Sequence, residues 1–133
     1  MATKTNPVVW FEIYINDMAR ARKFYETVLG KELIDMPMGE QTDLEDFEMV
    51  MFPFADDMNA PNASGALVKM EGVEAGGNST IVYFGCDDCT VEESRVVAAG
   101  GKVMKTKFSI GEYGFISLCF DTEDNCFGLH SMK

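Results

Sequence analysis

A repeat with a spacing of 70 residues is the sequence feature that most restricts the fold. Residues 8–17 (VVWFEIYIND) alternate as a strand that ends in an acid, and residues 18–30 (MARARKFYETVLG) have the apolar spacing of a helix that ends at a glycine. Further along the chain, STIVYFGCDD and CTVEESRVVAAGG repeat this order, and the distance from acid to glycine is 13 residues in both copies (17 to 30, 87 to 100). Two copies are too few for a solenoid, so the repeat predicts a pseudo-symmetric domain.

Each predicted helix is followed by three strand-like segments. They cover residues 31–36, 47–54 and 64–70 in the first copy and residues 102–108, 113–120 and 126–132 in the second. Turn-rich stretches such as DDMNAPNASG, EGVEAGGNS and DTEDN separate them. We therefore expect one α+β domain, residues 1–133, built from tandem βαβββ units at about residues 7–71 and 78–133. The curled sheets should form a cup with the helices on the outside.

Both helices carry recognisable end signals. Asp17 is placed to cap the first helix at about residues 17–29, and Gly30 to end it. For the second helix, at about residues 89–99, Thr90 and Glu93 have the spacing of a capping box. The first helix has an apolar stripe at helical spacing, made of Met18, Ala21, Phe24, Tyr25, Val28 and Leu29.

Charge and hydropathy exclude several classes of function. The chain has 22 acidic and 11 basic residues, a formal charge of −11, which disfavours nucleic acid and anionic membranes as partners. It has no run of about eighteen apolar residues that would span a bilayer. The N-terminal MATKTNP lacks the apolar core of a secretory signal, so we expect a cytoplasmic protein.

Four cysteines, Cys86, Cys89, Cys119 and Cys126, are expected to be reduced in that compartment. Cys86 and Cys89 match a C-x-x-C pattern, but no second such pair follows and the chain has a single histidine. Neighbouring acids should raise a thiol pKa, whereas a reactive thiol needs a lowered one. Core packing is therefore the favoured role for Cys89, which starts an apolar series with Val96 and Ala99.

Taken together, the segments IND…A…FYETVLG and CDD…AAGGKV in tandem βαβββ units resemble the vicinal oxygen chelate superfamily. That group includes glyoxalase I, bleomycin-resistance proteins and extradiol dioxygenases, and FPFADDMNAPNASGALVKME is similar to a subgroup related to lactoylglutathione lyase. The resemblance covers nearly the whole chain. It implies a cup that holds a small molecule, and pairing of two chains into a homodimer.

Metal-dependent members of that superfamily bind a divalent ion through histidines and glutamates, and this chain departs from their pattern. Indole, alkyl, hydroxyl and glycine positions offer no carboxylate or imidazole donor, so we predict no metal at these positions and no cofactor. A substitute site would need Glu12, His130 and Glu48, which are only three donors. The positions that match the family's ligands are Trp10, Thr80 or Ile81, Gly128, and one of Leu67, Val68 and Lys69.

Strand alternation predicts which side chains face the cup. Phe11, Ile13 and Ile15 should pack under the helix, which leaves Trp10, Glu12 and Tyr14 on the opposite face. On the last strand Phe127 and Leu129 should be buried. The predicted ligand-binding residues are therefore Trp10, Glu12, Tyr14, Gly128 and His130, with Glu12 and His130 as candidate catalytic groups.

Two hypotheses follow from this arrangement. In the first, the chain is a metal-free cup that binds a small organic molecule by stacking and a few polar contacts. In the second, it is a lyase, isomerase or dioxygenase-type enzyme, either with Glu12 as general base or with a metal at a displaced site. Simpler roles are also open: Glu12 paired with Lys69, Trp10 plugging the cup, and His130 serving only as a hydrogen-bonding residue.

Overall fold

The computed structural model describes residues 6–36, 47–57 and 60–133. Unit one contains β1 (Phe11–Tyr14), α1 (Met18–Leu29), β2 (Ile34–Asp35), β3 (Phe47–Met51) and β4 (Gly65–Met70). Unit two contains β5 (Val82–Gly85), α2 (Cys89–Val96), β6 (Lys102–Ser109), the short 3₁₀ helix η1 (Gly111–Tyr113), β7 (Phe115–Phe120) and β8 (Cys126–Ser131). The predicted α+β fold with two βαβββ units is confirmed.

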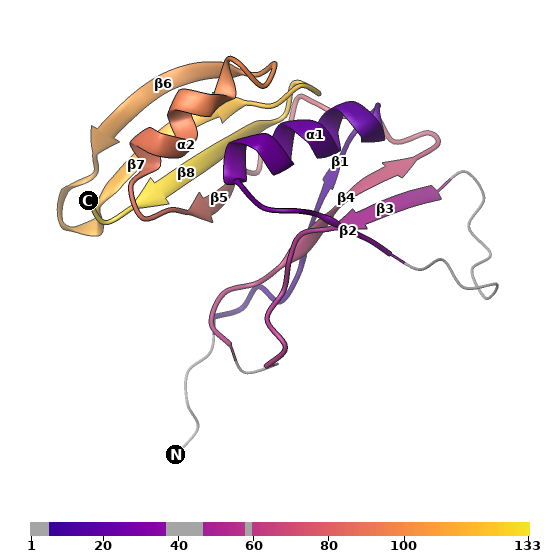
Figure 1. Cartoon of the computed structure of the whole chain (residues 1–133), viewed down its shortest axis with the longest axis horizontal. Helices are drawn as coiled ribbons and strands as arrows, with labels where there is room; N and C mark the ends of the chain where they lie inside the picture. Colours follow the sequence, from indigo (N-terminus) through magenta and orange to yellow (C-terminus); the bar gives the residue numbers. More distant parts are fainter. Residues whose placement is uncertain (1–5, 37–46, 58–59) are drawn as a thin grey trace.

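The two units have the same strand order. Unit one forms a four-stranded sheet in the order β1-β4-β3-β2, and unit two forms a second sheet in the order β5-β8-β7-β6 (Figure 1). The first strand of each unit along the chain pairs in parallel with its last strand, β1 with β4 and β5 with β8, and the remaining pairs are antiparallel. A parallel pair needs a long crossover, which the helix and the intervening strands supply. The first strand of each unit, β1 or β5, is therefore an edge strand.

Helix α1 matches its sequence signals closely. Asp17 caps it by accepting the backbone N–H of Arg20 at 3.0 Å, and Gly30 ends it in the left-handed region at φ 67°. Its buried face consists of Ala21, Phe24, Tyr25 and Val28, all on the predicted stripe.

Helix α2 begins at Cys89, as predicted, but its capping residue and its C-terminal end differ from the prediction. Asp88 caps it by accepting the Thr90 N–H at 2.9 Å, so Thr90 lies inside the first turn and the predicted capping box is wrong. Glu93 instead accepts the backbone N–H of Lys107 and the hydroxyl of Ser117 on the sheet below. The helix ends at Val96, three residues before the predicted end.

No helix among the described residues is long and apolar enough to cross a membrane.

An aromatic cluster joins the two units. The rings of Phe52 and Phe84 lie 5.4 Å apart, and those of Tyr25 and Phe127 lie 5.5 Å apart, so each pair links unit one to unit two. Helices α1 and α2 lie next to each other on the same side of the molecule (Figure 1), where Arg95 of α2 donates to the carbonyl of Val28 near the end of α1. The core therefore lies between the helices and the inner faces of both sheets.

The turn between β7 and β8 fastens unit two to the start of α1. The buried carboxylate of Glu123 accepts the backbone N–H groups of Asn16 and Asp17 at 2.9 and 2.8 Å and the guanidinium Nε of Arg20 at 2.7 Å. A negative charge here also meets the positive end of the helix dipole. These hydrogen bonds lower the pKa of Glu123 to about 2 even though burial opposes ionisation.

A second carboxylate in the same turn organises its own backbone. Asp121 accepts the N–H groups of Glu123 and Asn125 at 2.8 and 2.9 Å, together with the Tyr25 hydroxyl at 2.6 Å. Burial raises the pKa of Asp121, while these hydrogen bonds oppose the shift. The turn thus reaches α1 through Tyr25 as well as through Arg20. We call the contacts of Glu123 with Asn16, Asp17 and Arg20 the turn–helix latch.

Candidate functional site

The alternation predicted for the first strand is present in β1. Ile13 and Ile15 are buried in the core with Phe11 packed against it, whereas Trp10 and Glu12 are exposed on the opposite, outer face. The indole Nε1 of Trp10 donates to Glu12 at 3.3 Å, and the Tyr14 hydroxyl donates to the other carboxylate oxygen at 3.0 Å. Glu12 therefore lies between two aromatic rings because both rings donate to it, which fixes their orientation on the outer face.

The surroundings of Glu12 exclude one of its simpler roles. Lys69 lies opposite Glu48 in the β3–β4 register, and Glu12 is in register with Ala66, so the suggested Glu12–Lys69 ion pair is wrong. Burial raises the pKa of the Tyr14 phenol, and its hydrogen bond to Glu12 adds to that shift. The phenol thus remains a neutral hydrogen-bond donor toward the carboxylate.

The last strand also alternates as predicted. Phe127 and Leu129 are buried in the core, and Gly128 and His130 lie on the outer face of β8, in register with Tyr83 and Gly85 of β5. A Cβ added to Gly128 would meet the Tyr83 ring at 2.3 Å. Tyr83 thus covers the position where the family's pattern has a metal ligand. Sequence reasoning missed Tyr83, although its alternation with Phe84 indicated the outer face.

His130 has one ring nitrogen committed to structure. Its Nε2 lies 2.7 Å from the carbonyl oxygen of Tyr113. Because a carbonyl can only accept, Nε2 carries the proton, and the neutral ring has its Nδ1 left as an acceptor. His130 thus has the hydrogen-bonding role suggested from the sequence at Nε2, and Nδ1 is the ring atom that remains available to a ligand.

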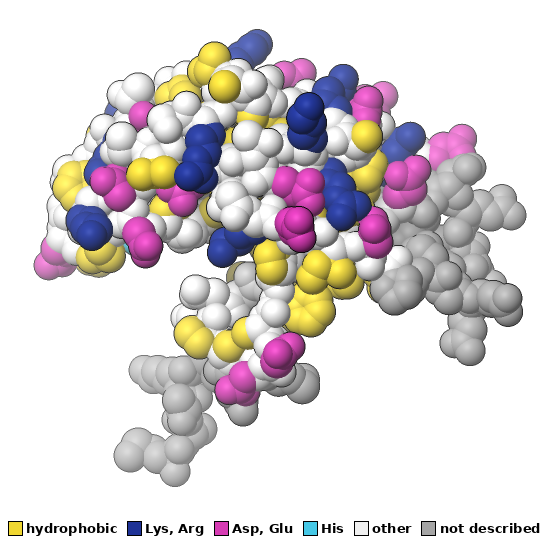
Figure 2. Space-filling model, viewed as in Figure 1, with side chains coloured by type: hydrophobic (Ala, Val, Ile, Leu, Met, Phe, Trp, Pro, Cys, Tyr) yellow, Lys and Arg dark blue, Asp and Glu magenta, His cyan; other side chains and the backbone are white. Residues whose placement is uncertain are grey.

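Trp10 and His130 line a common hollow of about 790 Å³, which we call the outer groove. One wall comes from residues that precede β1 and from the loop before β4, and the other comes from β5 with His130 of β8. Figure 2 shows a recess between this projecting part of the chain and the body, with apolar side chains gathered on the projection. The lining residues are Asn6, Val8, Trp10, Phe11, Asn62, Ala63, Thr80, Ile81, Val82, Tyr83, Phe84, Gly85 and His130.

Glu12 and Tyr14 line a smaller hollow further along the same seam between β1 and β5. This hollow has a volume of about 260 Å³ and is shared with residues 73–76 and with Asn125. Thr80 and Val82 line both hollows, so they are neighbours along the seam. The structure thus places Trp10 and His130 together and Glu12 and Tyr14 together, and it leaves Gly128 beneath Tyr83.

The cysteines are placed as expected for packing residues. Cys89 is fully buried, and all four thiols are free. Burial raises the pKa of Cys86 to about 12, with a further contribution from Glu92, and burial also raises the pKa of Cys119 and Cys126. The dominant cause of the Cys86 shift is burial rather than the neighbouring Asp87 and Asp88 of the sequence argument.

The residues present do not fit the divalent metal of the metal-dependent superfamily members. Trp10 offers an indole N–H that already donates to Glu12, and the Gly128 position is closed by Tyr83. Across residues 6–36, 47–57 and 60–133, no group of three histidine, cysteine or acidic side chains is placed to hold an ion. The substitute trio of Glu12, Glu48 and His130 therefore does not converge.

Comparison with known proteins supports the fold. A family model for the bleomycin resistance protein-like N-terminal region matches residues 8–45. A sequence comparison with curated proteins found no match. A mutant of glyoxalase I from Zea mays superposes with a TM-score of 0.72 at 22% identity, over 94% of this chain and 46% of that one, so this chain spans about half the length of the maize protein.

Two bacterial structures match over nearly their whole length. TnmS3, an antibiotic binding protein from Streptomyces sp. CB03234, has a TM-score of 0.68 at 20% identity, over 99% of this chain and 100% of that one. A glyoxalase/bleomycin resistance protein from the same strain has a TM-score of 0.66 at 19% identity, over 92% and 98%. The chain is thus similar in fold to glyoxalase and bleomycin-resistance proteins, as the sequence resemblance implied, and at these identities the superpositions establish the fold alone.

Proposed function

We propose that this protein binds a small organic molecule in the outer groove, without a metal at the family's ligand positions. The observation that carries the proposal is the pair of exposed rings, Trp10 before β1 and Tyr83 on β5, which line one hollow of about 790 Å³. Their exposed fractions are 40% and 46%, so both have surface left for a ligand. A hollow of that volume is in the range that holds drug-sized molecules.

The groove favours a flat, largely apolar ligand that carries a hydrogen-bond donor. Trp10 and Tyr83 offer faces for stacking, and Ile81 and Val82 add apolar wall. The free Nδ1 of His130 is an acceptor at the end of the groove, and Glu12 holds the Trp10 indole in place from outside it. The similarity to an antibiotic binding protein of the same fold supports this ligand class.

An enzyme is the second candidate, and a specific observation keeps it open. Glu12 is an exposed carboxylate on the same face, adjoining the smaller hollow, and a general base needs access to substrate in this way. The two aromatic donors already occupy one lone pair on each oxygen of Glu12. A metal-free lyase or isomerase would therefore have to use the remaining lone pairs, with substrate bound in the smaller hollow.

We also propose that the chain forms a homodimer, as the resemblance implies. Several apolar side chains are strongly exposed: Val8, which lines the outer groove, at 62%, its neighbour Val9 at 84%, and Phe54 at 54%. Exposed apolar side chains of this size are often covered at protein interfaces. Light scattering should give about twice the chain mass of 14.8 kDa at micromolar concentration, and a mass near 14.8 kDa would refute the dimer.

Trp10 provides the test of ligand binding because it is the single tryptophan of the chain. Its fluorescence should change saturably when a panel of flat aromatic antibiotics and bleomycin is titrated in the presence of EDTA. Tyr83→Ala should weaken the response about 10-fold, since stacking on one ring contributes on the order of 1 kcal/mol or more. Tyr113→Ala removes an exposed tyrosine ring outside the groove and is the matched control. Equal losses in the two variants would refute the assigned groove.

A further inference from the structure

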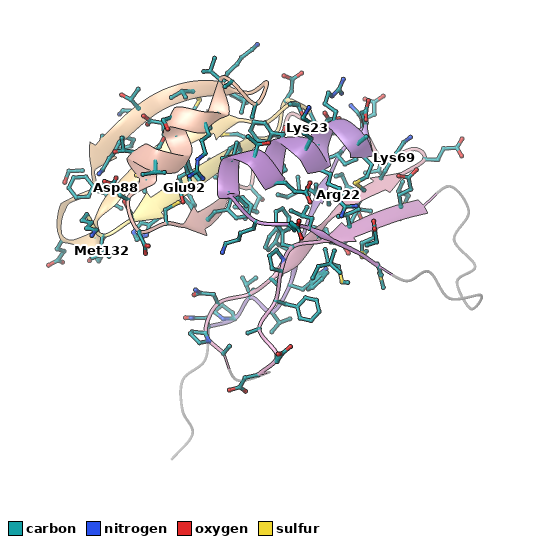
Figure 3. The ribbon with its side chains drawn as sticks, viewed as in Figure 1. Arg22, Lys23, Lys69, Asp88, Glu92 and Met132 are labelled. Atoms are coloured by element: carbon teal, nitrogen blue, oxygen red, sulfur yellow. The ribbon has the colours of Figure 1, made fainter. Side chains whose placement is uncertain are left out.

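A separate pocket opens on the helix side of the seam, opposite the face that carries Trp10 and Glu12. It lies between the C-terminal end of α1, the segment before β4, and β5, and we call it the inner pocket. Its volume is about 210 Å³. Figure 3 shows Glu92 on α2 beside the end of α1, and Glu92 also lines this pocket. The lining residues are Phe11, Leu29, Lys31, Phe52, Pro53, Ala63, Ser64, Phe84, Gly85 and Glu92.

Three phenylalanine rings form the apolar wall of the inner pocket. Phe11 lies 5.5 Å from Phe52 and 6.0 Å from Phe84, and Phe52 lies 5.4 Å from Phe84, measured between ring centroids. Phe52 is buried, whereas Phe11 and Phe84 keep part of their surface exposed toward the pocket. An apolar cavity of about 150 Å³ is enough to hold benzene, so this pocket has room for one ring and a short chain.

The mouth of the pocket offers one cation without a partner. Lys31 is exposed, and no ion pair joins it to a carboxylate among the described residues. Glu92 is half-buried, and its carboxylate interacts with the Cys86 thiol. The unpaired lysine beside an apolar pocket supplies a local partner for an anionic ligand group, which acts against the repulsion from the chain's formal charge of −11.

We propose that the inner pocket is a second binding site, which takes a compact aryl or branched-alkyl carboxylate with its apolar group against Phe11, Phe52 and Phe84 and its carboxylate toward Lys31. The site is distinct from the outer groove because Lys31, Leu29 of α1 and Glu92 of α2 line the inner pocket but not that groove. The two hollows meet at Phe11, Ala63, Phe84 and Gly85, which line both.

Phenylacetate is the probe, with benzyl alcohol and phenethylamine as its neutral and cationic counterparts. Titrations of the full-length chain are followed by ¹H–¹⁵N NMR. Phenylacetate should shift the amides of Leu29 and Ser64, which line the inner pocket and not the outer groove, with a Kd on the order of 1 mM, as ligand efficiencies allow for a molecule of this size. It should bind more tightly than either counterpart. Tighter binding of phenethylamine would show that Glu92 determines the ligand charge and would overturn the proposal.

A matched pair of lysine variants isolates the charge. Lys31→Met should weaken phenylacetate roughly 3- to 10-fold and leave benzyl alcohol unchanged, because an exposed charge pair contributes modestly. Lys23→Met removes an exposed lysine of α1 that lines neither the inner pocket nor the outer groove, and it should change neither Kd. Equal effects of the two variants on phenylacetate would overturn the role of Lys31.

Two further variants locate the ligand. Leu29→Trp should weaken phenylacetate and benzyl alcohol about 10-fold or more, because Leu29 lines the inner pocket and not the outer groove, and the larger side chain takes up space there. Trp10→Phe alters the outer groove alone and should leave both values unchanged. If Trp10→Phe abolishes binding while Leu29→Trp does not, the probe sits in the outer groove. That result would overturn the inner site and leave the proposed function in place.

Discussion

Replacement of Glu123 by glutamine tests how the two units are held together. The substitution keeps the shape and one acceptor oxygen for the Asn16 and Asp17 N–H groups, but it removes the charge that Arg20 binds. The pKa of Glu123 falls from 4.5 to about 2 on folding, which corresponds to roughly 3 kcal/mol. Arg20 is 52% exposed and solvent weakens the pair, so we expect a loss of about 2 kcal/mol at pH 7.

The pH dependence gives this prediction a second signature. A carboxylate whose pKa is lowered on folding contributes stability above its unfolded pKa of about 4.5, and that contribution is lost as the pH falls toward 2. Asp121 acts in the opposite direction because its pKa is raised, but it is present in both proteins. The difference in unfolding free energy between Glu123→Gln and the unsubstituted chain should therefore shrink between pH 4.5 and 2.

Urea denaturation followed by circular dichroism at pH 7, 4 and 2.5 measures this difference. Asp124→Asn is the matched control, since Asp124 is exposed in the same turn with φ 63°, a conformation that asparagine tolerates. The control should stay within about 0.5 kcal/mol of the unsubstituted chain. A Glu123→Gln loss below that value, or one that does not change with pH, would show that the turn–helix latch contributes little to stability.

Three further predictions concern the outer face of the sheets. Glu12→Gln should weaken ligand binding, because Glu12 orients the Trp10 indole, and it should lower the unfolding free energy by less than 1 kcal/mol because Glu12 is exposed. A larger loss of stability with unchanged ligand binding would mark Glu12 as purely structural. Gly128→Ala should cost about 1–3 kcal/mol through the Tyr83 ring, and much less in a Tyr83→Ala background; additive losses would contradict the contact. Zinc, nickel or manganese should leave the melting temperature unchanged, and a rise would count against a metal-free site.

Much of the fold was predictable because it depends on patterns that each unit repeats. The acid-to-glycine spacing placed both helices, and alternation placed Phe11 and Ile13 inside and Glu12 outside. The family resemblance identified the positions that lack metal donors. The predictions of helices and strand faces succeeded because these features are set by local periods of 3.6 and 2.

The candidate site was predictable in part. The sequence predicted that Trp10, Glu12 and His130 lie on the sheet faces turned away from the helices, as the lining of a cup, but it could not show that Trp10 and Tyr14 both donate to Glu12. It also missed Tyr83 over Gly128, because that contact depends on the β5–β8 register rather than on one strand. The capping-box error at Thr90 arose because Asp88, two residues earlier, is an equally good cap that begins the helix sooner.

The most direct test of the proposed binding site is the location of amide shifts when a flat aromatic antibiotic that changes Trp10 fluorescence is added in EDTA. In ¹H–¹⁵N spectra of the full-length chain, the Trp10 indole and the amides of residues 80–85 should move together with a single Kd, and the amides of Lys23 and Asp124 should stay in place. Shifts that cluster away from β5, or that appear only when a divalent ion replaces the EDTA, would contradict a metal-free binding site in the outer groove.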